Sequence, residues 1–150
     1  MNPDKSNTAE YALLPYKQAI ISVLYTGYWL SDRLNEQLKE FGLSEQQVNV
    51  LHILKAQAER ACNLCTIQEK MMHKMSNATR LVEKLRLKGL VKREIDEENR
   101  RRVEVSLTEK GIRLLEKIGE KLNEYHCEHE AKLTDQEYLQ LAELLDKMRK

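Results

Sequence analysis

The chain of 150 residues is long enough for one domain, or for one domain with an appended dimerisation element. Charged residues make up 33% and aromatic residues 5%, a composition typical of helices with solvated faces, yet the formal net charge is only +1. Without a run of eighteen apolar residues, a signal-peptide segment or a disulfide-like cysteine pattern, we expect a cytoplasmic protein with no membrane segment.

Residues 1–10 are polar and predict a short disordered tail. The first helix is expected from about Tyr11 to Phe41, where apolar residues recur at steps of three and four, and Gly42 offers a C-terminal cap. A helix of about thirty residues exceeds the usual three or four turns. It needs a partner along its length.

The second helix is expected to begin after Ser44, which is a favourable N-cap residue. The third helix has two candidate caps, Asn63 and Thr66. Its apolar stripe begins at Leu64, and this residue joins the stripe only if the helix is already under way there. We therefore choose Asn63.

The fourth helix is expected from near Met75 to Gly89. Its inward face comprises Ala78, Leu81, Val82 and Leu85. The apolar period then changes from 3.6 to 2, which predicts strands at residues 90–95 and 102–107 with a loop at 96–101. Thr108 and Thr134 are expected to cap a fifth and a sixth helix.

These elements follow the order α-α-α-α-β-β-α-α, a mainly α fold with a small β-hairpin wing. We predict a winged helix-turn-helix domain at residues 44–108. Residues 11–43 and 109–150 are expected to form a helical dimerisation region, because long helices with one apolar stripe complete their burial against a second subunit.

Positive charge is concentrated in the centre of the chain. Between Lys70 and Arg93 there are eight Lys or Arg against one acid, Glu83, which indicates contact with a polyanion. Four residues of the fourth helix offer hydrogen-bonding groups to the major groove of DNA: Ser76, Asn77, Thr79 and Arg80. Five more are expected to meet phosphates: Lys70, Lys74, Lys84, Arg86 and Lys88. The alternative is a merely solvated helix face, although such faces normally mix signs.

The predicted wing tip carries three consecutive arginines, Arg100, Arg101 and Arg102. A narrow minor groove attracts arginine through its enhanced negative potential. The alternative is local pairing with the acids of the same loop at residues 96–98. We favour the minor groove because the basic helix lies beside it in the sequence.

Two segments carry motifs of a known family: SNATRLVEKLRLKGLVKRE (Ser76 to Glu94) and NRRRVEVSLTEKG (Asn99 to Gly111). The first contains Leu-x-x-x-Gly-Leu-Val, and the second has Asn99-x-Arg101, five residues, then Leu-Thr. Both closely resemble the MarR family of bacterial winged helix-turn-helix regulators, which usually has Asp in place of Asn99.

The resemblance implies a homodimer built from the first, fifth and sixth helices and bound to a pseudo-palindromic operator in double-stranded DNA. It assigns the major groove to the fourth helix and the minor groove to Arg101. Family members commonly repress transcription and release DNA when a small, often aromatic, effector or an oxidant acts. Their effector pocket usually lies between the dimerisation helices and the winged domain.

Other side chains leave alternatives open. Tyr25, Tyr28 and Trp29 are candidates for an effector pocket, but they fit the packing of a dimer interface equally well. Cys62 and Cys65 have metal or redox spacing, yet a second such pair is absent, so we interpret them as ordinary thiols. We expect no metal and no cofactor.

The sequence shows no Gly-rich phosphate loop and no nucleophile motif, so we do not expect an enzyme and assign no catalytic residue. The leading hypothesis is a homodimeric, sequence-specific DNA-binding transcriptional regulator, a repressor relieved by a small effector. Two alternatives stay open: a winged-helix module that binds an acidic protein, and a metal- or redox-sensing regulator of the same fold.

Overall fold

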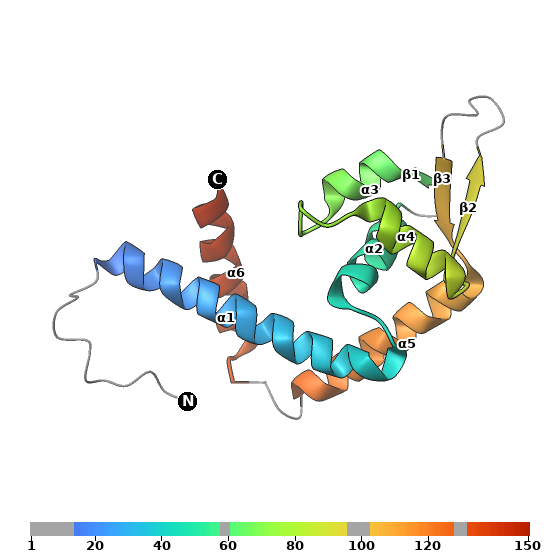
Figure 1. Cartoon of the computed structure of the whole chain (residues 1–150). Helices are drawn as coiled ribbons and strands as arrows, with labels where there is room; N and C mark the ends of the chain where they lie inside the picture. Colours follow the sequence, from blue (N-terminus) through green and yellow to red (C-terminus); the bar gives the residue numbers. More distant parts are fainter. Residues whose placement is uncertain (1–13, 58–60, 96–102, 128–131) are drawn as a thin grey trace. The chain divides into compact units, whose positions relative to one another are not determined.

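A computed structural model describes residues 14–57, 61–95, 103–127 and 132–150, and the chain divides into two compact units, Met1–Glu45 and Gln46–Lys150 (Figure 1). The elements are α1 (Pro15–Leu38), the 3-10 helix η2 (Lys39–Phe41), α2 (Glu45–Ala56), β1 (Cys62–Asn63), α3 (Leu64–Lys70), α4 (Ala78–Leu87), β2 (Val91–Ile95), β3 (Val103–Leu107), α5 (Glu109–Tyr125) and α6 (Asp135–Arg149). The mainly helical winged fold is confirmed. None of the helices in these ranges has the length and apolarity to cross a membrane.

In the first unit, α1 begins at Pro15. Proline suits a first helical turn because its fixed φ is helical and its missing N–H would have no partner there. The α-helix ends at Leu38 and continues as η2, so the prediction of one α-helix to Phe41 was too long. Gly42 then adopts φ 63°, as expected of a left-handed cap. The predicted tail at 1–10 lies outside the described residues.

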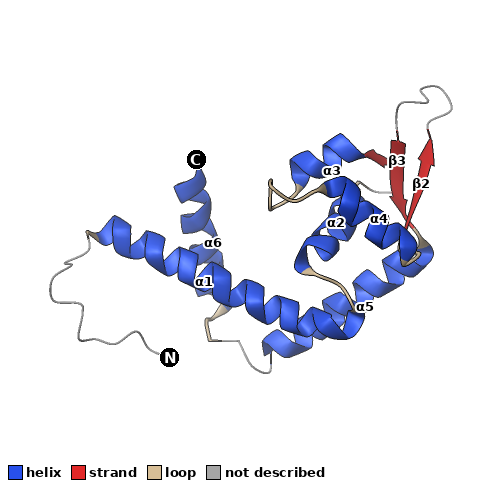
Figure 2. Ribbon diagram, in the orientation of Figure 1, coloured by secondary structure: helices blue, strands red, loops and turns tan. Residues whose placement is uncertain are grey.

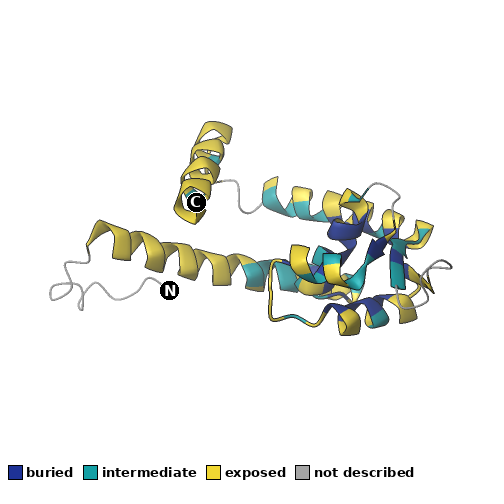
Figure 3. Ribbon diagram, turned by 90° about the horizontal axis from the view of Figure 1, so that it is seen from above, coloured by how far each residue is buried: buried dark blue, intermediate teal, exposed yellow. Residues whose placement is uncertain are grey.

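The outer part of α1 carries many exposed apolar side chains: Tyr16, Ile20, Ile21, Val23, Leu24, Tyr25, Tyr28, Trp29 and Leu30. Helix α6 of the second unit is similar, because none of its residues is buried and Leu139, Leu141, Leu144 and Met148 are exposed. Figure 3 shows this exposure along both helices in yellow. Exposed apolar surface on this scale is unusual for a soluble monomer.

The core of the second unit lies among α2, α3, α4, the sheet and α5. The largest fully buried side chains of this unit are Leu51, Ile67, Met71, Leu85, Leu90, Ile118, Val50, Val82 and Val105. The predicted inward face of α4 is confirmed, since Ala78, Leu81, Val82 and Leu85 are all buried. The opposite face of α4 is therefore the one presented to solvent.

The sheet is antiparallel, with strand order β1-β3-β2. The register pairs Val91 with Leu107 and Ile95 with Val103, so β2 and β3 form the predicted wing within one residue at each end. Strand β1 was not predicted. It consists of two residues, and Cys62 pairs with Val105 more than forty positions along the chain, a contact that no local period reveals.

Three predicted helix caps are confirmed. The Asn63 side chain accepts a hydrogen bond from the backbone N–H of Thr66 at 2.8 Å, so α3 does begin after Asn63. Thr108 caps α5 by accepting from the Gly111 N–H, and Thr134 forms a capping box with Glu137 at α6. Helix α2 starts directly after Ser44, at the expected place.

The wing, α4 and α5 meet at a tight junction. Gly89 ends the α4 turn with φ 70°, and its carbonyl accepts a hydrogen bond from the Thr108 hydroxyl at 2.7 Å. A Cβ on Gly111 would lie 2.2 Å from the carbonyl oxygen of Leu90, so only glycine fits there. The contacts of Thr108 with Gly89 and of Gly111 with Leu90 thus hold the start of α5 against the end of α4.

Candidate nucleic-acid interface

Helix α4 is the reading element expected from the sequence, but it begins at Ala78 instead of near Met75. Residues 71–77 form the connection from α3, drawn in tan in Figure 2. Asn77 is the N-cap, and its Oδ1 accepts a hydrogen bond from the backbone N–H of Arg80 at 2.9 Å. The local cap outweighs continuation of the helix because it satisfies a backbone donor that the helix leaves open.

This start changes how two predicted base-reading residues are held. Ser76 lies in the turn, not on the helix, and its carbonyl accepts a hydrogen bond. Bidentate pairing with adenine needs both ends of an asparagine amide, yet the Asn77 oxygen serves the cap. Thr79 and Arg80 are exposed in the first turn of α4, on the outward face as predicted.

One side chain that was not predicted organises the turn. The Gln68 amide nitrogen donates to the carbonyls of Lys74 at 3.0 Å and Ser76 at 2.7 Å. Its Oε1 accepts from the backbone N–H of Ala78 at 3.0 Å. Gln68 therefore joins α3 to both the turn and the first residue of α4. The sequence signal available was a glutamine on α3 at the boundary between its buried and exposed faces.

Two further contacts support the same turn. Asn49 of α2 accepts a hydrogen bond from the backbone N–H of Met72 at 3.1 Å. The Lys74 ammonium donates to the carbonyl of Glu69, near the end of α3. Lys70 and Lys74 are exposed beside this connection, where a preceding helix would cross a DNA backbone.

One of the basic residues on α4 has its charge balanced by a neighbouring acid. Arg86 forms a two-pronged ion pair with Glu83, with Nε to Oε2 at 3.0 Å and Nη2 to Oε1 at 2.8 Å. The Arg86 hydrogen bond holds the pKa of the Glu83 carboxyl below its usual range. Glu83 thus neutralises Arg86 in place. Lys84 on α4 and Lys88 directly after α4 are also exposed.

The wing is described at its base, where β2 and β3 pair from Val91–Leu107 to Ile95–Val103. Lys92 makes an exposed ion pair with Glu94 at 3.3 Å on β2. The predicted minor-groove residues Arg100, Arg101 and Arg102 lie outside the described residues, as do the acids at 96–98.

The candidate effector residues Tyr25, Tyr28 and Trp29 are exposed on α1. The guanidinium of Arg33 lies 5.2 Å from the centroid of the Trp29 ring, a cation–π contact within the same helix. These three side chains form part of the exposed apolar surface of α1.

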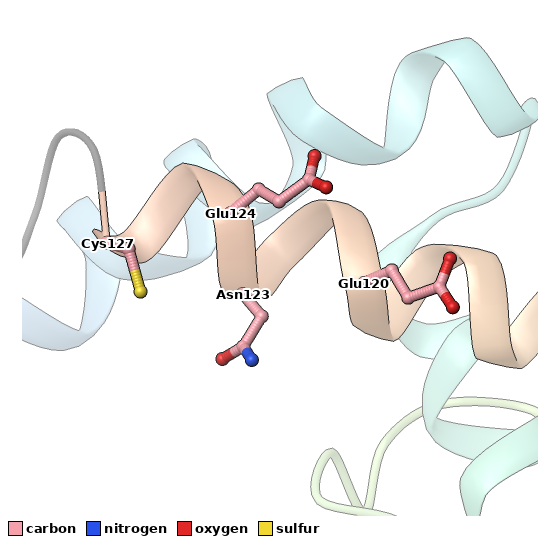
Figure 4. A pocket seen from close by; sticks show the side chains of 4 residues that line it. All are labelled: Glu120, Asn123, Glu124 and Cys127. Carbon is pink, nitrogen blue, oxygen red and sulfur yellow. The ribbon is translucent and has the colours of Figure 1, made fainter.

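The cysteines are free thiols, with Cys62 buried in β1 and Cys65 and Cys127 exposed. Burial raises the pKa of the Cys62 thiol, which disfavours the reactive thiolate. A hollow of about 420 Å³ along α5 is lined by Glu120, Asn123, Glu124 and Cys127 (Figure 4). Asn123 and Cys127 point to one side of α5 and Glu124 to the other. Among the described residues no cluster of three or more His, Cys, Asp or Glu could hold a metal ion.

Comparison with known proteins bears on the same segment that carries these features. Residues 43–103, from the start of α2 to the wing, match the family model described as "MarR family". This segment is therefore similar to the MarR family, over less than half of the chain. A comparison with curated protein sequences gives no match.

Solved structures extend the MarR likeness over most of the chain. A MarR-family transcriptional regulator from Rhodococcus sp. RHA1 has a TM-score of 0.77 and 23% identity, over 91% of this chain and 96% of the other. A mutant of MarR from E. coli has a TM-score of 0.69 and 26% identity, over 92% and 98%. BpsR from Bordetella bronchiseptica, whose DNA binding is regulated by 6-hydroxynicotinic acid, has a TM-score of 0.73 and 22% identity, over 88% and 99%.

Proposed function

We propose that the protein is a homodimeric, sequence-specific DNA-binding transcriptional regulator that acts in the cytoplasm. The observation that carries the proposal is the exposed first turn of α4, where Thr79 and Arg80 stand on a face with basic residues before and after it. Such a helix end suits the major groove, which admits one helix and is read through hydrogen bonds to base edges.

The contacts divide into two kinds. Arg80 is suited to guanine, Thr79 and Ser76 to bases or phosphates, and Asn77 to donation through its amide nitrogen. Lys70, Lys74, Lys84 and Lys88 supply phosphate contacts, and Arg86 joins them only if it leaves Glu83. We propose that Arg100, Arg101 and Arg102 of the wing bind in the minor groove.

The homodimer is supported by the exposed apolar side chains of α1 and α6. A homodimer through residues 11–43 and 109–150 would cover this surface and present two copies of the 44–108 domain. Two-fold symmetry would set the two α4 helices about one DNA turn apart, on a pseudo-palindromic operator.

The regulatory part of the proposal is repression relieved by a small aromatic effector. Its support is the MarR-like fold together with BpsR, a relative whose DNA binding responds to 6-hydroxynicotinic acid. Tyr25, Tyr28 and Trp29 are the candidate lining, either directly or as part of the dimer surface next to it.

The test begins with selection of operators from random duplexes by the purified protein, and light scattering for the mass in solution. We expect a two-fold symmetric consensus, a dimer mass, and an affinity that falls by orders of magnitude as salt rises. A salt-sensitive protein with no base preference would instead support the protein-interaction module. A monomeric mass would remove the homodimer. Small aromatic acids are then screened for release of the selected duplex.

A further inference from the structure

The turn before α4 presents an apolar side chain to solvent. Met75 is 98% exposed, the largest exposed fraction among the large apolar side chains of the described residues. In the sequence it lies between Lys74 and Ser76, two residues before the Asn77 cap. A methionine side chain left in water forgoes the favourable free energy of burying its apolar surface.

The backbone on both sides of Met75 is held in place. The Gln68 amide donates to the carbonyl of Lys74 before it and to that of Ser76 after it. The Ser76 N–H also donates to the carbonyl of His73 at 3.0 Å. The position of the Met75 Cα is therefore set by α3, while its unbranched side chain is free to adapt to a partner.

The surroundings indicate what that partner is. Lys74 and Arg80 lie before and after Met75 along an exposed basic surface, which suits a polyanion. In the major groove of DNA the apolar group offered by a base edge is the C5-methyl of thymine. DNA offers both kinds of group. Its phosphates suit the basic side chains, and a thymine methyl group suits the exposed methionine.

On the basis of the DNA-binding function proposed above, we propose that Met75 is a specificity-determining residue that packs on a thymine methyl group in each half-site. Met75 then adds an apolar base contact to the hydrogen bonds of Thr79 and Arg80. It extends the reading surface from the first turn of α4 back into the turn that Gln68 holds.

The experiment removes only the methyl group. Selected operator duplexes are compared with duplexes in which deoxyuridine replaces one thymine at a time, by fluorescence anisotropy. The wild type should lose about fourfold in affinity at one thymine per half-site, the value of one buried methyl-sized group. Met75→Ala should bind both duplexes equally at that position, and Met75→Leu should keep the discrimination.

Controls separate the outcomes. Leu87→Ala removes another apolar side chain, 72% exposed at the far end of α4, and should keep the discrimination. Met72→Ala tests the other methionine of the turn, 72% exposed, and loss of discrimination there alone would overturn the assignment to Met75. Selective binding without any Met75-dependent methyl effect overturns this inference and leaves the proposed function standing. Absence of any selective duplex overturns both.

Discussion

The Oε1 atom of Gln68 accepts a hydrogen bond from the backbone N–H of Ala78 at 3.0 Å, so a side chain of α3 caps the first residue of α4. The same amide binds two carbonyls of the intervening turn. The partly buried Gln68 side chain thus helps to set how α3 meets α4 and how Asn77, Thr79 and Arg80 are presented, together with the contacts of Asn49 and Lys74 to the same turn.

Gln68→Ala is therefore expected to weaken binding to a selected operator by about tenfold, or 1.4 kcal/mol. Affinity for random duplex should change little, because the lysines that meet phosphates remain. Gln68→Glu keeps the acceptor for Ala78 but loses the donors, so we expect an intermediate loss. Gln46→Ala, an exposed glutamine of α2, is the matched control. Equal losses on operator and random duplex would show that Gln68 acts on general stability alone, which urea unfolding measures separately.

Two glycines of α5 should respond to alanine with opposite signs. Gly111→Ala places a Cβ 2.2 Å from the Leu90 carbonyl oxygen and should destabilise the fold by about 1–3 kcal/mol or more. Gly119→Ala meets no atom within 4 Å and should stabilise it by about 0.5–1 kcal/mol, because alanine loses less backbone entropy in a helix. Urea unfolding of the two variants provides the comparison. Similar unfolding midpoints would contradict the close approach at Gly111.

We predict that the Glu83–Arg86 ion pair lowers the affinity for DNA. Glu83→Gln removes the partner of Arg86 and should free its guanidinium for a phosphate. We expect tighter binding to any duplex, and a plot of log affinity against log salt that steepens by about 0.9 for one added contact. Arg86→Ala should cost less affinity than Lys84→Ala, because Arg86 is already paired. The reverse order would show that the ion pair opens on DNA without cost.

The α6 capping box makes a prediction about pH. The backbone N–H and hydroxyl of Thr134 hydrogen-bond the Glu137 carboxylate and hold its pKa below the usual range. A carboxyl with a folded-state pKa below its unfolded value stabilises the fold above the unfolded pKa, about 4.3. That contribution is lost as pH falls through the folded-state value. NMR titration should show a higher Glu137 pKa in Thr134→Ala, and Glu137→Gln should lack this part of the acid-induced loss of helicity.

The wing is tested by Arg101→Ala. We expect weaker operator binding and, above all, less preference for A·T pairs in the flank under the wing, since a narrow minor groove is what attracts arginine. Arg93→Ala, an exposed arginine of β2, controls for loss of charge. If both variants lose affinity equally on A·T-rich and G·C-rich flanks, Arg101 acts as a general phosphate contact.

The features predicted best from the sequence are those that depend on residues close together in the chain. The caps Asn63, Thr108 and Thr134 are confirmed because a short polar side chain accepts a hydrogen bond from the backbone N–H three residues ahead. The inward stripe of α4 is confirmed because burial follows the helical period. Of the two segments that carry the MarR resemblance, Ser76 to Glu94 lies within the residues that the family model matches, and Asn99 to Gly111 begins there and extends beyond them.

What the sequence missed depends on contacts between distant residues. Strand β1 exists because Cys62 meets Val105 across the fold. The start of α4 depends on the competition between Asn77 and an earlier helical turn, which Gln68 helps decide from α3. The neutralising partner of Arg86 was visible in the sequence as Glu83, but only the geometry shows that the two charges are joined.

The junction at Gly89, Leu90, Thr108 and Gly111 limits how α4 can move. The last turn of α4, the base of the wing and the first turn of α5 share hydrogen bonds and a backbone contact too close for any side chain. Helix α4 and the wing base therefore cannot be repositioned independently of α5. In the dimer proposed above, a displacement of α5 would carry α4 and the wing base with it as one piece, which would change the distance between the two α4 helices and leave the shape of each DNA-facing surface unchanged.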